Sequence, residues 1–316
     1  MKIDFSRAVG LLKEADDILI LTHRNPDGDT LGSGYALLRA LRKTGKRVKL
    51  LNNDVIPEKF AYLYEGTEAE DFEEKFIVSV DVAEKKLLGD LFAEKYGDRV
   101  DLSLDHHESS KHFARETYVE PDSASACEII YLIIKALGVS VDSDIATCVY
   151  TGLSTDTGCF KYSNVTPRTH IIAAELISLG AEHSKINEKM FDTKTFGSIM
   201  LEKLCYENLE MFCSGRVAVI TVTKKMLSDC GVDKSALDAI KPITRQIEGV
   251  GIGITVKEED SGKAGVSVRT SEAYDASFIC SHFGGGGHIR AGGCELDGTV
   301  EEAKKRLTDY IEKNII

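Results

Sequence analysis

Short apolar runs alternate with helical patterns in the first part of the chain. The apolar runs are residues 17–23, 47–51, 76–80 and 100–104, and the clearest helical periodicity between them lies at 34–43 and 87–96. Strands that are buried on both faces of a parallel sheet read as continuous apolar runs. The order β-α-β-α-β-α-β therefore predicts an α/β domain with a doubly wound, mainly parallel sheet.

The pattern changes further along the chain. From about residue 123 to 179 it is helical. Ser123 or Ser125 is suited to cap the first of these helices, because a serine hydroxyl accepts hydrogen bonds from free N–H groups at a helix start. A helix over about 195–210 follows, with little turn chemistry in it. We expect this helix to connect two domains.

Strands and helices are mixed after this helix, which is typical of a smaller α+β domain. The expected strands are 217–222, 249–257 and 264–270, and the expected helices are 235–247, 274–283 and 300–312. A chain of 316 residues is long enough to form two separate cores. The predicted organisation is a first domain over 1–190, a linker helix over 191–212 and a second domain over 213–316.

Acidic and histidine side chains follow three of the predicted strands. His23, Asp81 and the run from Asp105 to His107 come directly after apolar runs, and Asp156 lies in an otherwise apolar neighbourhood. Ligands of doubly wound sheets collect beyond the carboxyl ends of the strands. A carboxylate that follows a buried run has to be solvated, paired or bound to a metal. We therefore expect these groups to form one site.

The segment from His23 to Asp29 adds further ligand atoms. Pro26 and Gly28 favour a tight turn that lets His23, Asp27 and Asp29 point into one cavity. Taken alone, the Asp-Gly-Asp sequence is also explained by a polar turn in which Asp29 caps the next helix. The complete set contains two histidines and four aspartates, and so much buried negative charge needs cations to offset it.

This ligand set is typical of two-metal hydrolysis at phosphorus. Two divalent ions roughly 3.5–4 Å apart can share a carboxylate and stabilise both the attacking and the leaving oxygen. Mixed carboxylate and imidazole ligands favour Mn²⁺, with Mg²⁺, Co²⁺ and iron as alternatives, and zinc is less favoured without cysteine ligands. We expect two divalent metal ions, with Mn²⁺ as the first choice.

A second candidate site is rich in glycine. Gly284, Gly285, Gly286 and Gly287 precede His288 and Arg290, and Arg269 ends a predicted strand. Glycine N–H groups can approach an anion closely, and histidine and arginine side chains donate hydrogen bonds to phosphate. The alternative is a flexible surface loop with incidental charge.

Composition limits the class of substrate. Lys and Arg number 39 against 51 Asp and Glu, so the net charge is −12 and most of the surface would repel a long polyanion. No apolar stretch has the length of a membrane span, and acidic residues stand where a signal peptide would be apolar. We expect a cytoplasmic protein without a membrane partner. The 8 cysteines show no C-x-x-C spacing, which indicates reduced core residues.

These motifs resemble those of a known family. His23-x-x-Pro-Asp27-x-Asp29, Asp81, Asp105-His106-His107 and Thr155-Asp156-Thr-Gly are similar to the four motifs of the DHH phosphoesterase superfamily. Gly-Gly-Gly-His288 is similar to the signature of its DHHA1 domain, and the size and domain order resemble the NrnA-like branch of nanoRNases and pAp phosphatases. The resemblance implies an enzyme that removes 5′-mononucleotides from very short oligonucleotides, the 3′-phosphate from pAp, or both.

The resemblance also implies residue roles. One ion would be held by His23, Asp27 and Asp81, and the other by Asp29, Asp81, His106 and Asp156. His107 would face the scissile phosphate, and Asp105 would orient the histidines. The substrate's remaining phosphate would be bound by Arg269, Gly285, Gly286, Gly287, His288 and Arg290.

Two departures from the family pattern leave substrate preference open. Ser110 stands where many relatives have Asn, and Ile-Arg-Ala-Gly-Gly follows His288 where the family often has Ala-Ala-Gly. Short RNA or DNA oligonucleotides, pAp, linear dinucleotides and cyclic di-AMP are all candidates, and both a monomer and a homodimer are compatible with the sequence. The alternatives are a manganese-dependent inorganic pyrophosphatase, whose Lys- and Arg-rich C-terminal signature we do not find, and a catalytically silent nucleotide-binding regulator.

Overall fold

The computed structural model describes residues 1–68, 70–240 and 242–316, without the side chains of Ser235, Asp238, Ala239 and His288. The chain divides into two compact units, Met1–Thr193 and Lys194–Ile316. In the described ranges, no helix combines the length and the apolar composition needed to cross a membrane.

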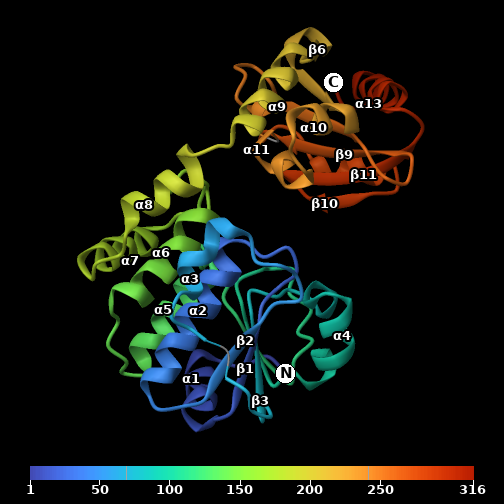
Figure 1. The fold of residues 1–316 in the computed structure, drawn as a ribbon. Helices are drawn as coiled ribbons and strands as arrows, with labels where there is room; N and C mark the ends of the chain where they lie inside the picture. Colours follow the sequence, from blue (N-terminus) through green and yellow to red (C-terminus); the bar gives the residue numbers. More distant parts are fainter. Residues whose placement is uncertain (69, 241) are drawn as a thin grey trace. The chain divides into compact units, whose positions relative to one another are not determined.

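The first unit is built on a five-stranded parallel sheet with the order β2-β1-β3-β4-β5 (Figure 1). Its strands are β1 (Ile18–Leu21), β2 (Val48–Leu51), β3 (Phe76–Val80), β4 (Leu102–Asp105) and β5 (Glu116–Val119). The four expected strands and the α/β class are confirmed. The edge strand β5 was not expected, because it contains only four residues.

Helices cover both faces of this sheet. Ile18 and Ile20 of β1 pack into one apolar cluster with the helices α1, α2 and α5, whereas Leu19 and Leu21 pack into another cluster beside α4 (Figure 1). Both faces of β1 are therefore buried, which explains its continuous apolar run. The helices of the unit are α1 (Phe5–Glu14), α2 (Gly28–Lys43), α3 (Ala61–Tyr64), α4 (Asp90–Tyr96), α5 (Ala126–Ala136), α6 (Ser143–Asp156), α7 (Pro167–Ser178) and α8 (His183–Asn187).

The second unit is built on a six-stranded mixed sheet with the order β10-β11-β9-β8-β7-β6. Only β7 and β8 pair in parallel, and the other pairs are antiparallel. The strands are β6 (Glu210–Phe212), β7 (Val217–Val222), β8 (Ile252–Glu258), β9 (Lys263–Thr270), β10 (Gly286–His288) and β11 (Ala291–Asp297). This mixed sheet agrees with the expected α+β domain.

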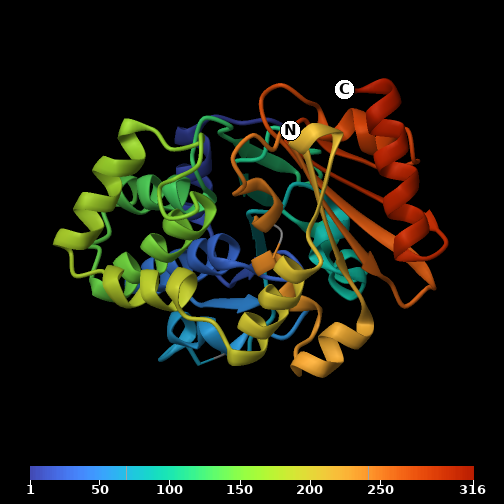
Figure 2. The same ribbon diagram turned by 90° about the horizontal axis from the view of Figure 1, so that it is seen from above.

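The second sheet is also covered on both faces. Val217 and Val219 of β7 face a cluster that contains α12 and α13, and Ile220 and Val222 face a cluster that contains α9 and α11. Figure 2 shows α13, in red, running along one face of this sheet. The helices of the unit are α9 (Phe196–Glu207), α10 (Lys224–Cys230), α11 (Leu237–Ile240), α12 (Ala276–Ser281) and α13 (Val300–Asn314).

Two segments differ in detail from the expected pattern. The continuous helix expected over 235–247 is wrong, because Pro242 interrupts it and leaves α11 and a 3₁₀ turn over Ile243–Arg245. The helix expected to link the domains is α9, and its buried side of Leu201 and Cys205 packs in the core of the second unit. All eight cysteines are free thiols, as expected.

Candidate metal centre

Neighbouring strands and two helix ends bring the predicted ligands together. His23, Asp81 and His106 follow β1, β3 and β4, which lie side by side in the sheet. Asp27 and Asp29 stand at the start of α2, and Asp156 ends α6. Because all these strands are parallel, their carboxyl ends meet at one edge of the sheet.

Helices α2 and α6 approach each other closely at this edge. A Cβ atom at Gly152 of α6 would lie 2.6 Å from Oδ1 of Asp29 and 2.3 Å from Sγ of Cys127. Only glycine fits this position without displacing either group. The close approach allows the start of α2 and the end of α6 to contribute carboxylates to the same site.

The first group of candidate ligands is His23, Asp27 and Asp81. Nε2 of His23 lies 3.6 Å from Oδ1 of Asp27 and 3.4 Å from Oδ2 of Asp81. Nδ1 of the same ring lies 2.8 Å from the carbonyl oxygen of Arg24, which fixes its proton on Nδ1. The ring therefore presents Nε2 to the carboxylates, in the orientation that a metal ligand needs.

The second group is Asp29, His106 and Asp156. Nε2 of His106 lies 3.8 Å from Asp29, 3.6 Å from Asp156 and 3.5 Å from Oδ1 of Asp81. Its Nδ1 lies 3.3 Å from the carbonyl oxygen of Ser123. Each of the two groups could hold a metal ion by the separation of its ligand atoms.

Asp81 stands between the two groups. Its Oδ2 faces His23, its Oδ1 faces His106, and the side chain is buried. Oδ1 has no hydrogen-bond partner among the described residues, although a buried carboxylate oxygen strongly requires one. A cation between the groups would satisfy this oxygen, so the residues fit a pair of divalent ions that share Asp81.

Electrostatics couples the imidazoles to the carboxylates. Burial lowers the pKa of His23, but Asp27 and Asp81 outweigh it and raise the value to about 11. Burial is likewise outweighed at His106, where Asp81 and Asp29 raise the pKa to about 10. The two imidazolium groups in turn hold the pKa of Asp81 well below its usual value, against its burial. Divalent ions would supply the same positive charge, so their binding would displace protons from both rings.

Asp29 and Asp156 behave differently from Asp81. Burial, together with the charge of Asp81, raises the pKa of Asp29 well above its usual value. Burial also raises the pKa of Asp156 to about 7. Ionising both carboxylates would place more negative charge in the second group than its histidine can offset, and a bound cation would supply the missing positive charge.

His107 borders the two groups: its Nδ1 lies 3.6 Å from Oδ1 of Asp81, and Asp81, His106 and His107 form a third possible ligand group. Asp105 is fully buried, and its Oδ1 accepts hydrogen bonds from Nδ1 of His107 at 2.8 Å and from the backbone N–H of His106 and His107 at 2.9 and 3.2 Å. This contact raises the pKa of His107. The His107 side chain is 41% exposed, so its Nε2 can reach a bound molecule.

Asp29 has a partner that the sequence did not reveal. Its carboxylate accepts the backbone N–H groups of Ala126 at 2.6 Å and Cys127 at 2.9 Å, at the N-terminus of α5. Asp27, rather than Asp29, caps α2 by accepting from Asp29 and Thr30. The expected N-cap of α5, Ser125, is confirmed, since its side chain accepts from the N–H of Glu128. The signal for the Asp29 contact could not be read locally, because 97 residues separate the partners.

A partly buried ion network lies next to the second group. Arg168 of α7 donates to Glu120 at 2.7 Å, to Oγ of Ser123 at 2.9 Å and to the buried Glu128. The carbonyl group of Ser123 is the partner of His106. This network was not predicted, because its members are ordinary charged residues in the sequence. It holds the segment that orients His106.

The glycine-rich segment of the second unit forms a hairpin rather than an open loop. Gly286 and Gly287 lie in β10, which pairs with β11 across a turn at Ile289 and Arg290. Gly285 precedes the strand, and a Cβ atom there would lie 2.1 Å from the carbonyl oxygen of Gly293. The close approach of the two chains therefore requires glycine at position 285.

The basic residues around this hairpin contact the main chain. The Arg290 guanidinium donates to the carbonyl oxygens of Ser271 and Tyr274 at 2.7 and 2.8 Å, and that of Arg269 donates to Val268 at 3.1 Å. Arg269 and Ala291 are direct neighbours across β9 and β11. The side chain of His288 lies outside the described residues. The hairpin thus brings Arg269 and Arg290 to one end of the sheet.

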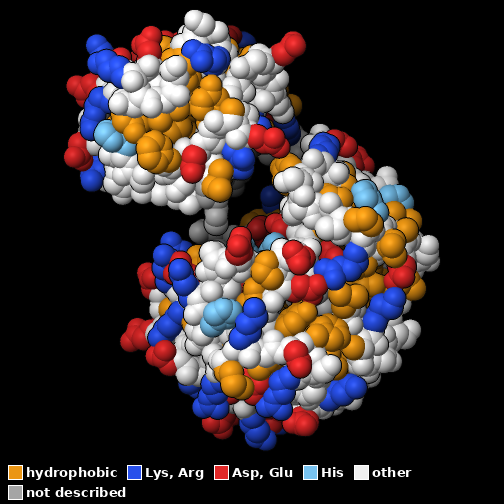
Figure 3. Space-filling view, turned by 180° about the vertical axis from the view of Figure 1, so that it is seen from behind, with side chains coloured by type: hydrophobic (Ala, Val, Ile, Leu, Met, Phe, Trp, Pro, Cys, Tyr) orange, Lys and Arg blue, Asp and Glu red, His pale blue; other side chains and the backbone are white. Residues whose placement is uncertain are grey.

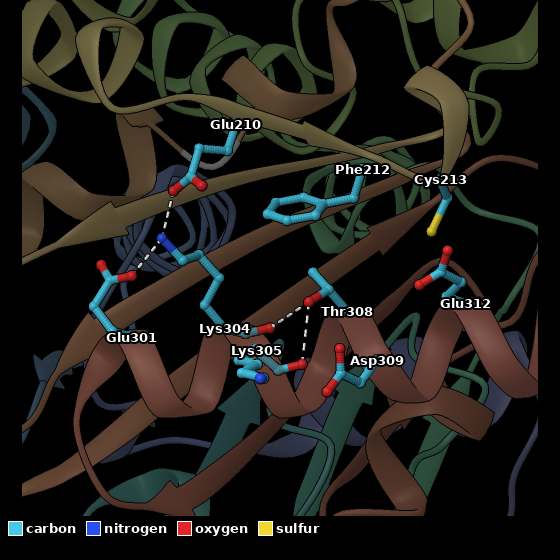
Figure 4. A pocket seen from close by; sticks show the side chains of 9 residues that line it. All are labelled: Glu210, Phe212, Cys213, Glu301, Lys304, Lys305, Thr308, Asp309 and Glu312. Carbon is cyan, nitrogen blue, oxygen red and sulfur yellow. Dashed lines mark hydrogen bonds and ion pairs between the residues drawn. The ribbon is translucent and has the colours of Figure 1, made fainter.

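Two further cavities differ in their chemistry. One of about 500 Å³ lies in the first unit and is lined by Arg24, Asn25, Asn53, Asp54 and residues 89–91. The other, also of about 500 Å³, lies between β6 and α13 in the second unit. Figure 4 shows its Lys304 ammonium held between Glu210 and Glu301, so this positive charge is already neutralised. The Lys304 ammonium of the second cavity is therefore not free to bind a phosphate.

A parallel sheet with buried aspartates and histidines at its carboxyl edge, followed by a smaller mixed-sheet unit, is the architecture of a two-domain metallohydrolase. Residues 17–153 match the N-terminal domain of the DHH family, and residues 215–315 match the DHHA1 domain. The two matches together cover most of the chain, which therefore belongs to the DHH family and carries both domains, and the resemblance seen in its motifs is confirmed.

Known proteins match the chain over almost its whole length. The bifunctional oligoribonuclease and PAP phosphatase NrnA of Thermus thermophilus is 28% identical over 305 residues, which are 94% of this chain and 90% of that protein. NrnA of Bacillus subtilis is 25% identical over 98% of this chain and 97% of its own. A crystal structure of an exopolyphosphatase-related protein from Bacteroides fragilis has a TM-score of 0.88 at 24% identity, covering 98% of this chain and 96% of its own.

Proposed function

We propose that this chain is a metal-dependent phosphoesterase that hydrolyses short oligonucleotides to 5′-mononucleotides and pAp to AMP. The observation that carries the proposal is the buried Asp81, shared between two groups of aspartate and histidine ligands. Membership of the DHH family and similarity to proteins named as oligoribonuclease and PAP phosphatase support it.

The proposed cofactors are two divalent metal ions, with Mn²⁺ preferred over Mg²⁺ or Co²⁺. One would be held by His23, Asp27 and Asp81, and the other by Asp29, Asp81, His106 and Asp156. Bound ions supply charge that stabilises the attacking and leaving oxygens at phosphorus. The orphaned Oδ1 of Asp81 supports the sharing of this carboxylate.

His107 is the proposed proton donor. Asp105 holds the proton of Nδ1 and so leaves Nε2 free to face a phosphate oxygen or the leaving group. The raised pKa of His107 favours the protonated ring, which is the form that can donate. Asp105 would act through His107 and through the backbone of the histidine pair, as a positioning residue.

The second unit is proposed to bind a further phosphate of the substrate. The proposed contacts come from the hairpin and from the neighbouring strand end, through Arg269, Gly285, Gly286, Gly287, His288 and Arg290. For Arg269 and Arg290 this requires exchange of main-chain carbonyl partners for phosphate oxygens. Such an exchange is favourable, because hydrogen bonds to charged groups are stronger than those to carbonyls.

The distribution of charge on the surface favours short substrates over long nucleic acids. On the face shown in Figure 3, Lys and Arg side chains alternate with Asp and Glu, and the described residues form no continuous basic track there. A long nucleic acid needs such a track for its many phosphates. The net charge of −12 adds repulsion outside the site.

The test is turnover of a small panel of substrates with Mn²⁺, Mg²⁺ or Co²⁺ present. The panel contains pAp, pApA, cyclic di-AMP, an RNA of about five nucleotides and inorganic pyrophosphate. We expect release of AMP from pAp and pApA and no release of phosphate from pyrophosphate. Hydrolysis of pyrophosphate alone would contradict the proposal in favour of a pyrophosphatase, and binding of nucleotides without turnover would indicate a regulator.

A further inference from the structure

The segment after α6 forms a left-handed turn next to the second ligand group. Gly158, Cys159 and Phe160 have φ angles of 56°, 58° and 62°. Residues with a Cβ avoid this region, and successive ones persist only where their surroundings hold them. The Thr157 hydroxyl supplies such a contact, since it donates to the Leu153 carbonyl at 2.6 Å and accepts from the Phe160 N–H at 3.1 Å.

Further hydrogen bonds tie this turn to the metal centre. The N–H of Tyr162 donates to the Thr157 carbonyl at 3.1 Å. The Asn164 amide donates to the carbonyl oxygens of Asp156 at 3.2 Å and Ala124 at 2.9 Å. The segment is thereby fixed both to the ligand Asp156 and to the residues before α5.

The turn holds the ring of Tyr162 on a glycine. A Cβ atom at Gly158 would lie 2.3 Å from Cζ of Tyr162, so the ring rests against the backbone two residues beyond Asp156. Tyr162 is nevertheless 59% exposed, and no hydrogen bond of its hydroxyl is found among the described residues. By contrast, the ring of Phe160 is stacked on His170, with centroids 5.5 Å apart.

We propose that Tyr162 is a stacking platform for the nucleobase of the nucleotide whose phosphate is bound at the metal centre. The inference rests on the proposed function. A nucleobase is joined to its phosphate by a single sugar, so its partner has to lie close to the ligands, as Tyr162 does through Gly158. Every base has a π face, so stacking accepts all four bases of a short oligonucleotide. A fixed ring also loses little conformational entropy on binding.

The test compares two ligands that differ only in the base. Binding of AMP and of ribose 5-phosphate is measured by calorimetry with Mn²⁺ present, for the wild type and for Tyr162→Ala. We expect the Kd for AMP to rise roughly five- to hundredfold in the variant, and that for ribose 5-phosphate to stay unchanged. Tyr162→Phe should bind AMP like the wild type. Tyr206→Ala is the matched control, because Tyr206 of α9 is also exposed, at 55%.

A second variant separates stacking from support of the turn. Tyr162→Leu fills the space above Gly158 without a π face, and we expect it to bind AMP as weakly as Tyr162→Ala. AMP binding at the wild-type level in Tyr162→Leu, or an equal loss for both ligands in Tyr162→Ala, would overturn the inference. Failure of the wild type to hydrolyse any nucleotide of the panel contradicts the proposed function instead. Normal hydrolysis with unchanged AMP binding in Tyr162→Ala contradicts only the stacking.

Discussion

The metal centre of the first unit and the glycine-rich hairpin of the second differ in how completely the fold prepares them. In the centre, Asp29 and Asp81 are buried, and both histidines present Nε2 to carboxylates less than 4 Å away. Around the hairpin, Arg269 and Arg290 are bound to main-chain carbonyls. The core already holds the ligand groups of the first site in place. At the second site, the arginines have to release main-chain carbonyls before they can bind a phosphate.

Physical chemistry accounts for this contrast. Buried charges are costly, so their positions have to be fixed by surrounding hydrogen bonds, as the N–H groups of α5 fix Asp29. Arg290 is exposed and Arg269 is half-buried, so both guanidinium groups keep solvation and can move at lower cost than the buried carboxylates. Changes in the metal centre should therefore abolish function, whereas changes at the hairpin should weaken binding.

The largest effect is expected for Asp81→Ala. Because this carboxylate faces both ligand groups, its loss should reduce hydrolysis of pApA to the level without enzyme, with the fold retained. The measurements are turnover with Mn²⁺ and circular dichroism. Asp98→Ala is the control, since Asp98 is 86% exposed and its one ion pair among the described residues is with Lys85. An Asp81→Ala protein with near-normal turnover would refute the assignment of a shared ligand.

Removing the ion network of Arg168 tests whether this network contributes to metal binding by the second ligand group. The double variant Arg168→Met with Glu128→Gln avoids leaving a buried carboxylate unpaired. It should weaken Mn²⁺ binding roughly ten- to a hundredfold through Ser123 and His106, with turnover restored at high Mn²⁺. A Mn²⁺ titration measures this effect. Arg115→Met, which removes an exposed pair with Asp101, should leave the titration unchanged.

Arg269→Ala tests the hairpin side of the comparison. A hydrogen bond to a charged group contributes about 1.5–3 kcal/mol, so KM for pApA should rise roughly ten- to a hundredfold with kcat little changed. A nitrophenyl phosphodiester without a second phosphate should show no change. Arg306→Ala is the matched control, because its guanidinium also donates to a main-chain carbonyl of the second unit. An equal loss on both substrates would show that Arg269 does not bind the second phosphate.

The last prediction concerns the protons of the two histidine rings. His23 and His106 have pKa values of about 11 and about 10, so both rings are protonated at neutral pH before a metal binds. A ring has to lose its proton to become a ligand, so Mn²⁺ affinity should increase as pH rises from 6 to 9, by up to about tenfold per unit for each proton released.

Calorimetry in buffers of different ionisation enthalpy counts these protons. His23→Gln should release about one proton fewer than the wild type, and His112→Gln, at an exposed position, should release the same number. A Mn²⁺ affinity that does not depend on pH would show that the rings are neutral before binding. Groups other than the two imidazole rings would then have to balance the negative charge of the carboxylates.

Much of the fold could be predicted because local patterns carry it. Buried strands read as apolar runs, and the strand 217–222 has the bounds expected for it. The helix predicted over 235–247 is wrong, because Pro242 ends α11 and a 3₁₀ turn follows. It missed β5, whose four residues alternate between half-buried and buried positions and resemble a loop.

For the site, the sequence by itself determined which chemical groups are present and where along the chain they stand. Aspartate and histidine follow buried strands, and strands of one parallel sheet end at one edge, so a shared site could be inferred without coordinates. The tertiary structure alone decided which atoms meet. Asp29 accepts hydrogen bonds from the start of α5, 97 residues away, and Arg168 donates to Ser123, 45 residues away. The glycine-rich segment forms a hairpin with β11. Such contacts depend on how helices pack on the sheet, and packing is set by the whole core rather than by any short stretch of sequence.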